Sequence, residues 1–238
     1  MMIDVIWHDV ECSRYAADLP VWRELARAEA GPVLDVGAGT GRVTLDLARH
    51  GHRVVALDRE PAFLAALRER AGDLPVETVV ADASGFDLEG RRFGLVIAPM
   101  QTIQLLGDAG RAGFLRSCRA HLAPGGLLAC AMTGEMEAFD DSSFVLPLPD
   151  MTIIDGTSYF SQPTALRDLG ERMAIERVRT VVNAGGQRWS SDDVIHLDKV
   201  ATEQVELEAL QAGFSPLGTR VIAPTEEHEG TEVVMLRG

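Results

Sequence analysis

The sequence predicts an α/β fold: a seven-stranded, mostly parallel sheet with helices on both faces, plus an antiparallel β insertion. Two observations carry this prediction. Short apolar runs rich in valine and leucine alternate with segments of helical periodicity, which is typical of β-α-β units. Each of the first four runs is followed within two residues by glycine, proline or an acidic residue, which favour loops. The predicted strands are residues 33–36, 53–57, 76–80, 93–98, 127–132, 214–221 and 231–236.

The first predicted strand runs directly into a glycine-rich loop. Gly37, Gly39 and Gly41 precede residues 42–49, which have the pattern of a helix. Glycines permit close approaches that a Cβ would block, and a helix that begins here points its free N–H groups at a ligand. The spacing is G-x-G-x-G, whereas the dinucleotide fingerprint G-x-G-x-x-G would place its third glycine at Arg42. The loop therefore predicts a nucleotide pocket for a ligand other than a nicotinamide dinucleotide.

Acidic residues follow the second and third predicted strands. Asp58 comes directly after residues 53–57, and a carboxylate in this place can accept both hydroxyls of a ribose. Asp82 and Ala83 follow residues 76–80. Loops that leave the carboxyl ends of parallel strands emerge at one edge of a sheet, so we expect both carboxylates beside the glycine loop.

The fourth and fifth strands complete the pattern. Residues 93–98 run into Pro99-Met100-Gln101, and a predicted helix over 110–122 leads to the turn Ala123-Pro124-Gly125-Gly126 before residues 127–132.

This succession resembles the class I S-adenosylmethionine-dependent methyltransferases, over residues from about 15 to 132 and, more weakly, from about 202 to the end. The resemblance implies a Rossmann-like sheet whose last strand is antiparallel, with S-adenosylmethionine as cofactor and S-adenosylhomocysteine as product. It implies that the methionine part is held by Asp35, Gly37, Ala38, Gly39, Thr40 and Gly41. It places the ribose at Asp58 with Arg59, and the adenine at Asp82 with Ala83. It places the methyl group and the amino end of the cofactor at Pro99, Met100 and Gln101.

Composition and charge narrow the classes of substrate and partner that the protein can have. The net charge of −14 and the absence of a segregated basic stripe exclude a nucleic-acid substrate. No apolar run approaches the ~20 residues that span a bilayer, and no signal peptide precedes the first strand, so we expect no membrane partner and a cytoplasmic protein. Cys12, Cys118 and Cys130 lack metal-ligand spacing, so we expect reduced thiols and no metal. The sequence leaves open whether the chain is a monomer or a homodimer.

We expect one methyltransferase domain over residues 1–238. Within it, residues 1–30 form an N-terminal helical lid with a helix over 15–30, and 31–132 form the cofactor-binding core. Residues 133–200 form a β-rich insertion that covers the active-site edge, and 201–238 complete the core. The insertion contains β-rich runs at 173–182 and 187–197, and the intervening residues Asn183-Ala184-Gly185-Gly186 predict a hairpin.

Candidate catalytic residues come from the predicted cover and from the loop after the fourth strand. Methyl transfer is an in-line displacement, which needs a general base only where the nucleophile is protonated. His8, His196 and His228 are candidate bases, and His196 is favoured because Asp198 shares its strand face. Tyr15 is placed over the cofactor by the resemblance. Gln101 and Gln104 are three residues apart and are expected to face the pocket together.

An acidic stretch follows the fifth strand and includes Glu135, Asp140 and Asp141. Negative walls near the acceptor would attract an amine, which favours N-methylation slightly over O-methylation; a solvated acidic loop is the competing interpretation. The sequence predicts a small-molecule methyltransferase.

Three alternatives remain open. One is a non-catalytic S-adenosylmethionine-binding protein, and another is an NAD(P)-binding oxidoreductase, which the glycine spacing opposes. The third is an aminopropyl transferase on the same fold, which usually has an acidic residue directly after the fourth strand, where this chain has Pro99.

Overall fold

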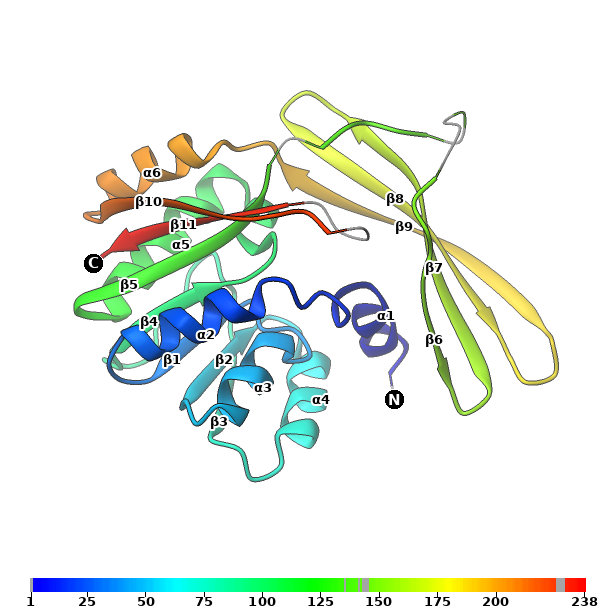
Figure 1. The fold of residues 1–238 in the computed structure, drawn as a ribbon, viewed down its shortest axis with the longest axis horizontal. Coiled ribbons are helices and arrows are strands. Elements are labelled where there is room, and N and C mark those ends of the chain that lie inside the picture. The colour runs from blue at the N-terminus through cyan, green and yellow to red at the C-terminus, as the bar shows by residue number, and fades with distance from the viewer. Residues whose placement is uncertain (1, 135, 141, 143–145, 226–229) are drawn as a thin grey trace. The chain divides into compact units, whose positions relative to one another are not determined.

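The computed structural model describes all residues except 1, 135, 141, 143–145 and 226–229 (Figure 1). The chain divides into two compact units. The larger contains Ala16–Gly134 and Val200–Gly238, and the smaller contains Met1–Tyr15 and Glu135–Lys199. The segment 1–30, expected as one lid, is thus divided between the two units.

The larger unit is built on a seven-stranded sheet of order β10-β11-β5-β4-β1-β2-β3. Strands β1 to β5 pair in parallel, and β11 is antiparallel to both β5 and β10. The predicted fold class is confirmed, including the antiparallel end of the sheet. The strands are β1 Val33–Val36, β2 Val54–Asp58, β3 Val76–Val80, β4 Phe93–Ala98, β5 Leu122–Thr133, β10 Ser215–Ile222 and β11 Thr231–Arg237.

Helices cover both faces of this sheet because the central strands have apolar side chains on both sides. In β1, Val33 packs in a cluster with Trp22 and Leu47, whereas Leu34 belongs to a second cluster with Phe114. The helices are α2 Leu19–Ala28, α3 Arg42–Arg49, α4 Pro61–Ala71, α5 Gly107–His121 and α6 Thr202–Gln211, with a short 3-10 helix η1 at Thr102–Leu105. The predicted helix over 15–30 is too long at its N-terminal end: α2 begins at Leu19, with Pro20 in its first turn.

The smaller unit contains a four-stranded antiparallel sheet, β6-β7-β8-β9, and the helix α1 Ile3–Cys12. The strands are β6 Asp150–Ile154, β7 Thr157–Asp168, β8 Arg172–Val182 and β9 Arg188–Asp198. The predicted hairpin is confirmed, since the side-chain oxygen of Asn183 accepts hydrogen bonds from the backbone N–H groups of Gly185 and Gln187 between β8 and β9.

Helix α1 packs against the sheet of its own unit. The Trp7 ring meets the Tyr159 ring edge to face, with ring centroids 5.6 Å apart. The Glu11 carboxylate accepts two hydrogen bonds from the Arg179 guanidinium, each 2.8 Å long, and one of 2.7 Å from the Ser161 hydroxyl. An apolar contact and a nearly buried ion pair therefore fix the helix on the strands.

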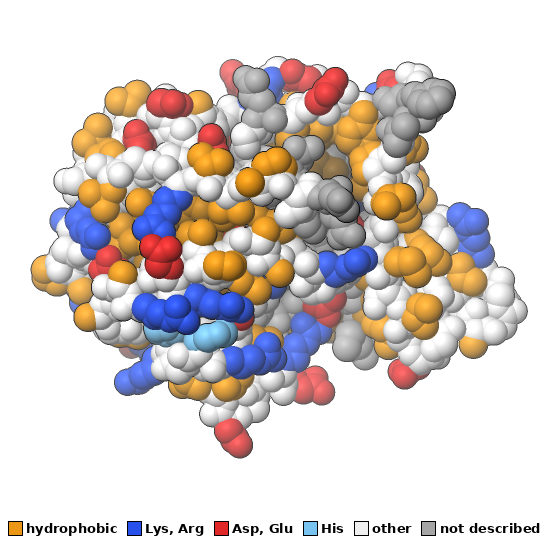
Figure 2. All heavy atoms as spheres, viewed as in Figure 1, with side chains coloured by type: hydrophobic (Ala, Val, Ile, Leu, Met, Phe, Trp, Pro, Cys, Tyr) orange, Lys and Arg blue, Asp and Glu red, His pale blue; other side chains and the backbone are white. Residues whose placement is uncertain are grey.

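The charged surface is mixed. On the face shown in Figure 2, basic side chains gather beside the histidines of the larger unit, with acidic side chains close by. Several arginines of this unit are paired, such as Arg23 with Asp46 at 2.5 Å and Arg237 with Glu29 at 2.8 Å. Across the described part of the chain, no helix has both the length and the apolar character needed to cross a membrane.

Candidate active site

The site of interest lies where β1 is flanked by β2 on one side and β4 on the other. The strand order changes direction at β1, and in open α/β sheets a ligand crevice typically forms at such a point, outside the carboxyl ends of the strands. The glycine loop follows β1, and Pro99-Met100-Gln101 follows β4. This topology brings together the two loops that the sequence analysis had singled out.

The glycine loop is held against β2 by its backbone. The N–H groups of Gly37 and Ala38 both donate to the carbonyl oxygen of Leu57, at 2.8 and 3.0 Å. Gly37 has φ of 75°, and a Cβ there would lie 2.6 Å from the hydroxyl oxygen of Thr102. At Gly41, φ is 98° and a Cβ would lie 2.2 Å from Leu67. Only glycine fits at these two positions, and α3 begins immediately afterwards.

Asp58 joins the glycine loop to the end of β2. Its Oδ2 accepts a hydrogen bond from the Gly39 N–H at 2.8 Å, and its Oδ1 accepts one from the Glu60 N–H at 2.9 Å. Sequence reasoning missed this structural role, because it depends on the loop folding back toward β2. Each carboxylate oxygen can accept a second hydrogen bond, so the same group has acceptor capacity for a ligand.

Asp82 occupies the loop after β3. Its Oδ1 accepts a hydrogen bond from the Ser84 N–H at 2.7 Å. Hydrogen bonds from the Ser84 side chain and backbone lower the pKa of Asp82, and the positive charge of Arg59 adds to the effect. Arg59 itself is exposed, with its Nε 3.6 Å from Glu60. The Asp82 carboxylate is therefore a charged acceptor at neutral pH.

The loop after β4 has a strained backbone. Met100 has φ of 54°, which side chains other than glycine rarely adopt. Pro99 is buried, and its carbonyl oxygen accepts a hydrogen bond from the Thr102 hydroxyl at 2.8 Å. Gln101 is half-buried and lies just before η1. Strain of this kind is concentrated at ligand sites, where the surrounding structure maintains it.

Gln104 has a structural role, and the acceptor contact predicted for it stays a prediction. Its side chain is buried, its Oε1 accepts a hydrogen bond from the Thr133 N–H at 2.9 Å, and its Nε2 donates to the Thr133 carbonyl oxygen at 3.2 Å. These two bonds attach η1 to the end of β5.

Asp35 is a buried acid at the base of the glycine loop. Only 1% of the residue is exposed, and its Oδ2 accepts a hydrogen bond from the Thr44 hydroxyl at 2.6 Å. Its Oδ1 has no hydrogen-bond partner among the described residues. Burial raises the pKa of Asp35 to about 6, although the Thr44 hydrogen bond and the charge of Arg42 oppose the rise. An orphaned carboxylate oxygen beside a glycine loop suits a ligand with a cationic group.

Most of the remaining candidates belong to the smaller unit. Tyr15 is buried at the end of its first segment, His8 lies in α1, and His196 is exposed on β9. Asp198, expected to orient His196, accepts a hydrogen bond from Arg172 at 3.0 Å. Asp140 accepts hydrogen bonds from the Ser142 N–H and hydroxyl, which lower its pKa. Glu135, Asp141 and His228 lie outside the described residues.

The proposed roles of these residues stay predictions. The described residues also contain no group of three or more His, Cys, Asp or Glu side chains that could hold a metal ion.

The seven-stranded sheet and its glycine loop define a class of fold, the one that the resemblance to class I S-adenosylmethionine-dependent methyltransferases predicts. Residues 33–126 match the family described as Methyltransferase domain. The chain is 34% identical over 101 residues to a ubiquinone biosynthesis O-methyltransferase from Methylocella silvestris. That alignment covers 42% of this chain and 38% of the relative, so the shared part is well under half of either protein.

Solved structures resemble the whole chain. DesVI from Streptomyces venezuelae has a TM-score of 0.75 at 22% identity, covering 97% of this chain and 96% of DesVI. The sugar N-methyltransferase KedS8 from a Streptoalloteichus species also has a TM-score of 0.75 at 22% identity, covering 100% of this chain and 94% of KedS8. At this level of identity the likeness establishes the fold.

Proposed function

We propose that this protein transfers the methyl group of S-adenosylmethionine to a small-molecule acceptor and releases S-adenosylhomocysteine. The observation that carries the proposal is the buried Oδ1 of Asp35, which has no hydrogen-bond partner among the described residues. It lies next to a glycine loop in which a Cβ at Gly37 would collide with Thr102. A buried carboxylate oxygen without a partner is costly unless a ligand satisfies it. The ammonium group at the methionine end of the cofactor is a suitable partner.

The other residues of the crevice fit the rest of the cofactor. The second lone pairs on Asp58 suit the ribose hydroxyls, and the charged Asp82 with Ala83 suits the adenine amino group. Pro99, Met100 and Gln101 follow β4, on the other side of the crevice, and suit the methyl end. When bound, the cofactor supplies a methyl group activated by a sulfonium. The protein's own contribution is then to align the acceptor and exclude water, and alignment alone lowers such barriers by up to ~7–11 kcal/mol in model systems.

We propose an amine as the reacting group of the acceptor. The chain carries a net charge of −14, and Asp140 is held ionised by Ser142, so a cationic acceptor would be attracted. KedS8 is a sugar N-methyltransferase, which also supports nitrogen, whereas the Methylocella relative is an O-methyltransferase. A bound amine must lose a proton before attack, and His196 is our candidate base, with Tyr15 and Gln101 as candidates for positioning the reacting groups.

Calorimetric titration tests the cofactor assignment. Purified protein is titrated in parallel with S-adenosylmethionine, S-adenosylhomocysteine and NADPH. We expect both adenosyl ligands to bind and NADPH not to bind. A folded sample that ignores the adenosyl ligands would refute the proposal, and NADPH binding in their place would support an oxidoreductase.

An acceptor screen tests the reaction. Small primary and secondary amines, amino sugars and phenols are incubated with S-adenosylmethionine, and S-adenosylhomocysteine release is followed. Turnover of amines over phenols supports N-methylation, and the reverse preference refutes it. Cofactor binding with no turnover across the screen would support the non-catalytic alternative.

A further inference from the structure

Part of the loop after β3 is attached to one side of α5 by hydrogen bonds. The Ser117 hydroxyl oxygen accepts a hydrogen bond from the Phe86 N–H at 3.0 Å, and Nε2 of His121 accepts one from the Leu88 N–H at 3.1 Å. Nδ1 of His121 lies 3.1 Å from the carbonyl oxygen of Arg91. Because Nε2 accepts, Nδ1 carries the proton and donates to this oxygen. Both ring nitrogens of His121 therefore hold the loop.

A close backbone contact adds a third attachment. Gly113 of α5 lies against the carbonyl group of Ser84, and a Cβ at Gly113 would collide with that oxygen. The attachment points on the helix, residues 113, 117 and 121, are four positions apart and share one face, whereas those on the loop, residues 84, 86 and 88, are two positions apart. Four helical residues rise about 6 Å and two residues of extended chain about 6.6 Å, so the spacings match. Residues 84–88, here called the strap, thus follow α5.

Apolar side chains of the strap add to these attachments. Phe86 and Leu88 are buried and belong to the same cluster as Phe114 and Cys118 of α5. The Phe86 ring stacks on the His121 ring, with ring centroids 5.6 Å apart and an angle of 18° between the planes. The strap is therefore held by hydrogen bonds, ring stacking and burial on a single helix.

The strap begins two residues after Asp82. Oδ1 of Asp82 accepts a hydrogen bond from the Ser84 N–H at 2.7 Å, and its carbonyl oxygen accepts one from the Gly85 N–H at 3.1 Å. Asp82 itself is exposed. An exposed side chain keeps one orientation only at an entropic cost that its contacts must offset. The position of the strap thus decides where the Asp82 carboxylate points.

We propose that Ser117 and His121 are positioning residues for recognition of the adenine base of the cofactor. By holding the strap on α5 they fix Ser84, and through Ser84 the Asp82 carboxylate, where it accepts a hydrogen bond from the amino group of the base. This inference rests on the proposed function. A displaced strap would leave the carboxylate charged but misdirected, so the site would lose its preference for an amino group over an oxygen.

The test compares the affinities of two ligands by calorimetry. S-adenosylhomocysteine has the amino group, and S-inosylhomocysteine has an oxygen in its place. The wild type should prefer S-adenosylhomocysteine by about tenfold or more, because the Asp82 carboxylate accepts a hydrogen bond from the amino group and repels the oxygen. Asp82→Asn should remove most of this preference.

Two kinds of variant release the strap. Ser117→Ala and His121→Phe each remove a hydrogen-bond acceptor, and His121→Phe keeps a ring that can stack on Phe86. Gly113→Ala displaces the Ser84 carbonyl group and removes no side-chain partner. Each variant should lower the preference for S-adenosylhomocysteine by about threefold or more, the effect of one hydrogen bond, and should change the affinity for S-inosylhomocysteine little.

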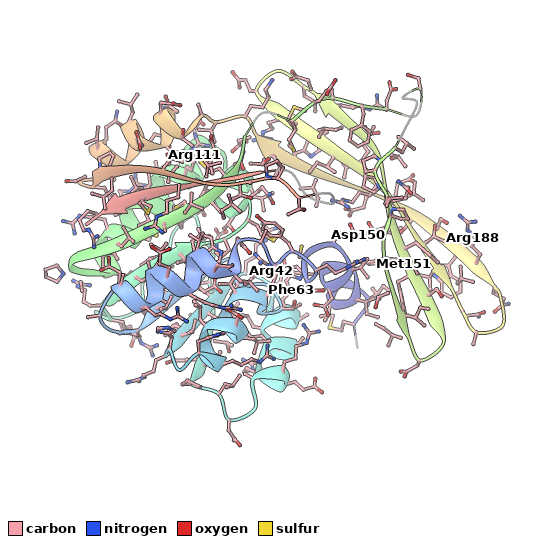
Figure 3. All side chains as sticks on the ribbon, viewed as in Figure 1. Arg42, Phe63, Arg111, Asp150, Met151 and Arg188 are labelled. Carbon is pink, nitrogen blue, oxygen red and sulfur yellow. The ribbon has the colours of Figure 1, made fainter. Side chains whose placement is uncertain are left out.

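Two control variants separate positioning from general loss of stability. Arg111, labelled in Figure 3, lies on another face of α5, and its Nε is 2.9 Å from Glu208 of α6. Arg111→Gln should lower stability and leave the ratio of the two affinities unchanged, since a loss of folded protein affects both ligands equally. Ser117→Thr keeps the hydroxyl group and should keep the wild-type ratio.

An unchanged ratio in Ser117→Ala, His121→Phe and Gly113→Ala would overturn the inference, and so would an equal drop in Arg111→Gln. A wild type that binds both ligands with the same affinity would also overturn it. If His121→Phe does not fold, Ser117→Ala and Gly113→Ala decide. Failure of the wild type to bind S-adenosylhomocysteine would instead refute the proposed function.

Discussion

Asp35 lies within β1 and Asp82 in the loop after β3, and their surroundings shift the pKa values of the two carboxyl groups in opposite directions. Burial raises the pKa of Asp35 to about 6, whereas hydrogen bonds from Ser84 lower the pKa of the exposed Asp82. Asp82 was predicted from its position after the third strand, and Asp35 from the resemblance to the methyltransferase family. The opposite shifts of their pKa values could not be predicted from the sequence, because burial and hydrogen bonding depend on packing from other elements.

Asp58 provides the first prediction at this scale. Asp58→Ala removes two hydrogen bonds to backbone N–H groups and the proposed acceptor for the ribose. We expect cofactor affinity to weaken by roughly 1.5–3 kcal/mol for each charge-assisted hydrogen bond lost to the ligand. Calorimetry with S-adenosylhomocysteine measures the loss. Asp73→Ala, an exposed acid before β3, is the matched control, and equal affinity in the two variants would contradict the ribose assignment.

Asp35 also predicts how stability depends on pH. Its folded-state pKa lies above the usual value of 3.8, so the native state holds its proton more tightly than the unfolded chain. The stabilisation from the protonated group is complete below about pH 4 and is lost as pH rises through about 6. Asp35→Asn cannot ionise and should gain stability relative to the wild type over this window, by on the order of 2–3 kcal/mol at about 1.4 kcal/mol per pKa unit.

Urea unfolding at several pH values measures this difference. The gap in unfolding free energy between Asp35→Asn and the wild type should widen from about pH 4 to pH 7. A gap that does not change with pH would show that Asp35 keeps an ordinary pKa in the folded protein.

At the scale of secondary structure, the ion pair between Glu11 and Arg179 fixes α1 on its sheet. Burial alone would raise the pKa of Glu11, but hydrogen bonds from Arg179 and Ser161 bring it below its usual value. The Arg179 guanidinium also lies 5.6 Å from the centre of the Trp7 ring. One arginine thus satisfies the acid and supports the aromatic contact of the same helix.

Removing that arginine should loosen α1. Arg179→Ala leaves Glu11 buried without its main cation, and breaking a buried pair costs about 3–5 kcal/mol. We expect lower stability and faster amide exchange in α1, measured by hydrogen–deuterium exchange. Arg172→Ala breaks the more exposed Arg172–Asp198 pair in the same sheet and should cost about 0–1 kcal/mol. Comparable exchange in the two variants would show that α1 is held by its apolar contacts alone.

The elements differ in how far the sequence predicts them. Buried strands such as β1 and β4 were found because their apolar runs are bounded by loop residues. Strands β6 and β7 were missed, since β7 contains Pro163 at a register shift and alternates apolar with polar residues only irregularly. Helix α1 was not delimited because no side chain caps its N-terminus.

At the scale of the whole molecule, strand order decides where the site forms. The placement of β1 between β2 and β4 makes the glycine loop and the loop after β4 border one crevice. The sequence predicts each strand and the residues that follow it. The pairing that assembles those residues is a property of the sheet, and so is the link between Asp58 and Gly39.

The net charge supplies the last prediction. A chain with a charge of −14 creates a negative potential that attracts cations and is screened by salt over about 10 Å at 0.1 M. If the acceptor is an amine, kcat/KM for a cationic acceptor should fall several-fold from about 0.02 M to 0.2 M NaCl, because electrostatic steering weakens. The kcat/KM of a neutral phenol accepted by the same enzyme should change little.

Asp140→Asn separates the attraction by this loop from the attraction by the net charge of the whole chain. A raised KM for the amine with an unchanged salt dependence assigns part of the attraction to the loop. Equal effects on the KM values of amine and phenol would remove the case for steering by Asp140.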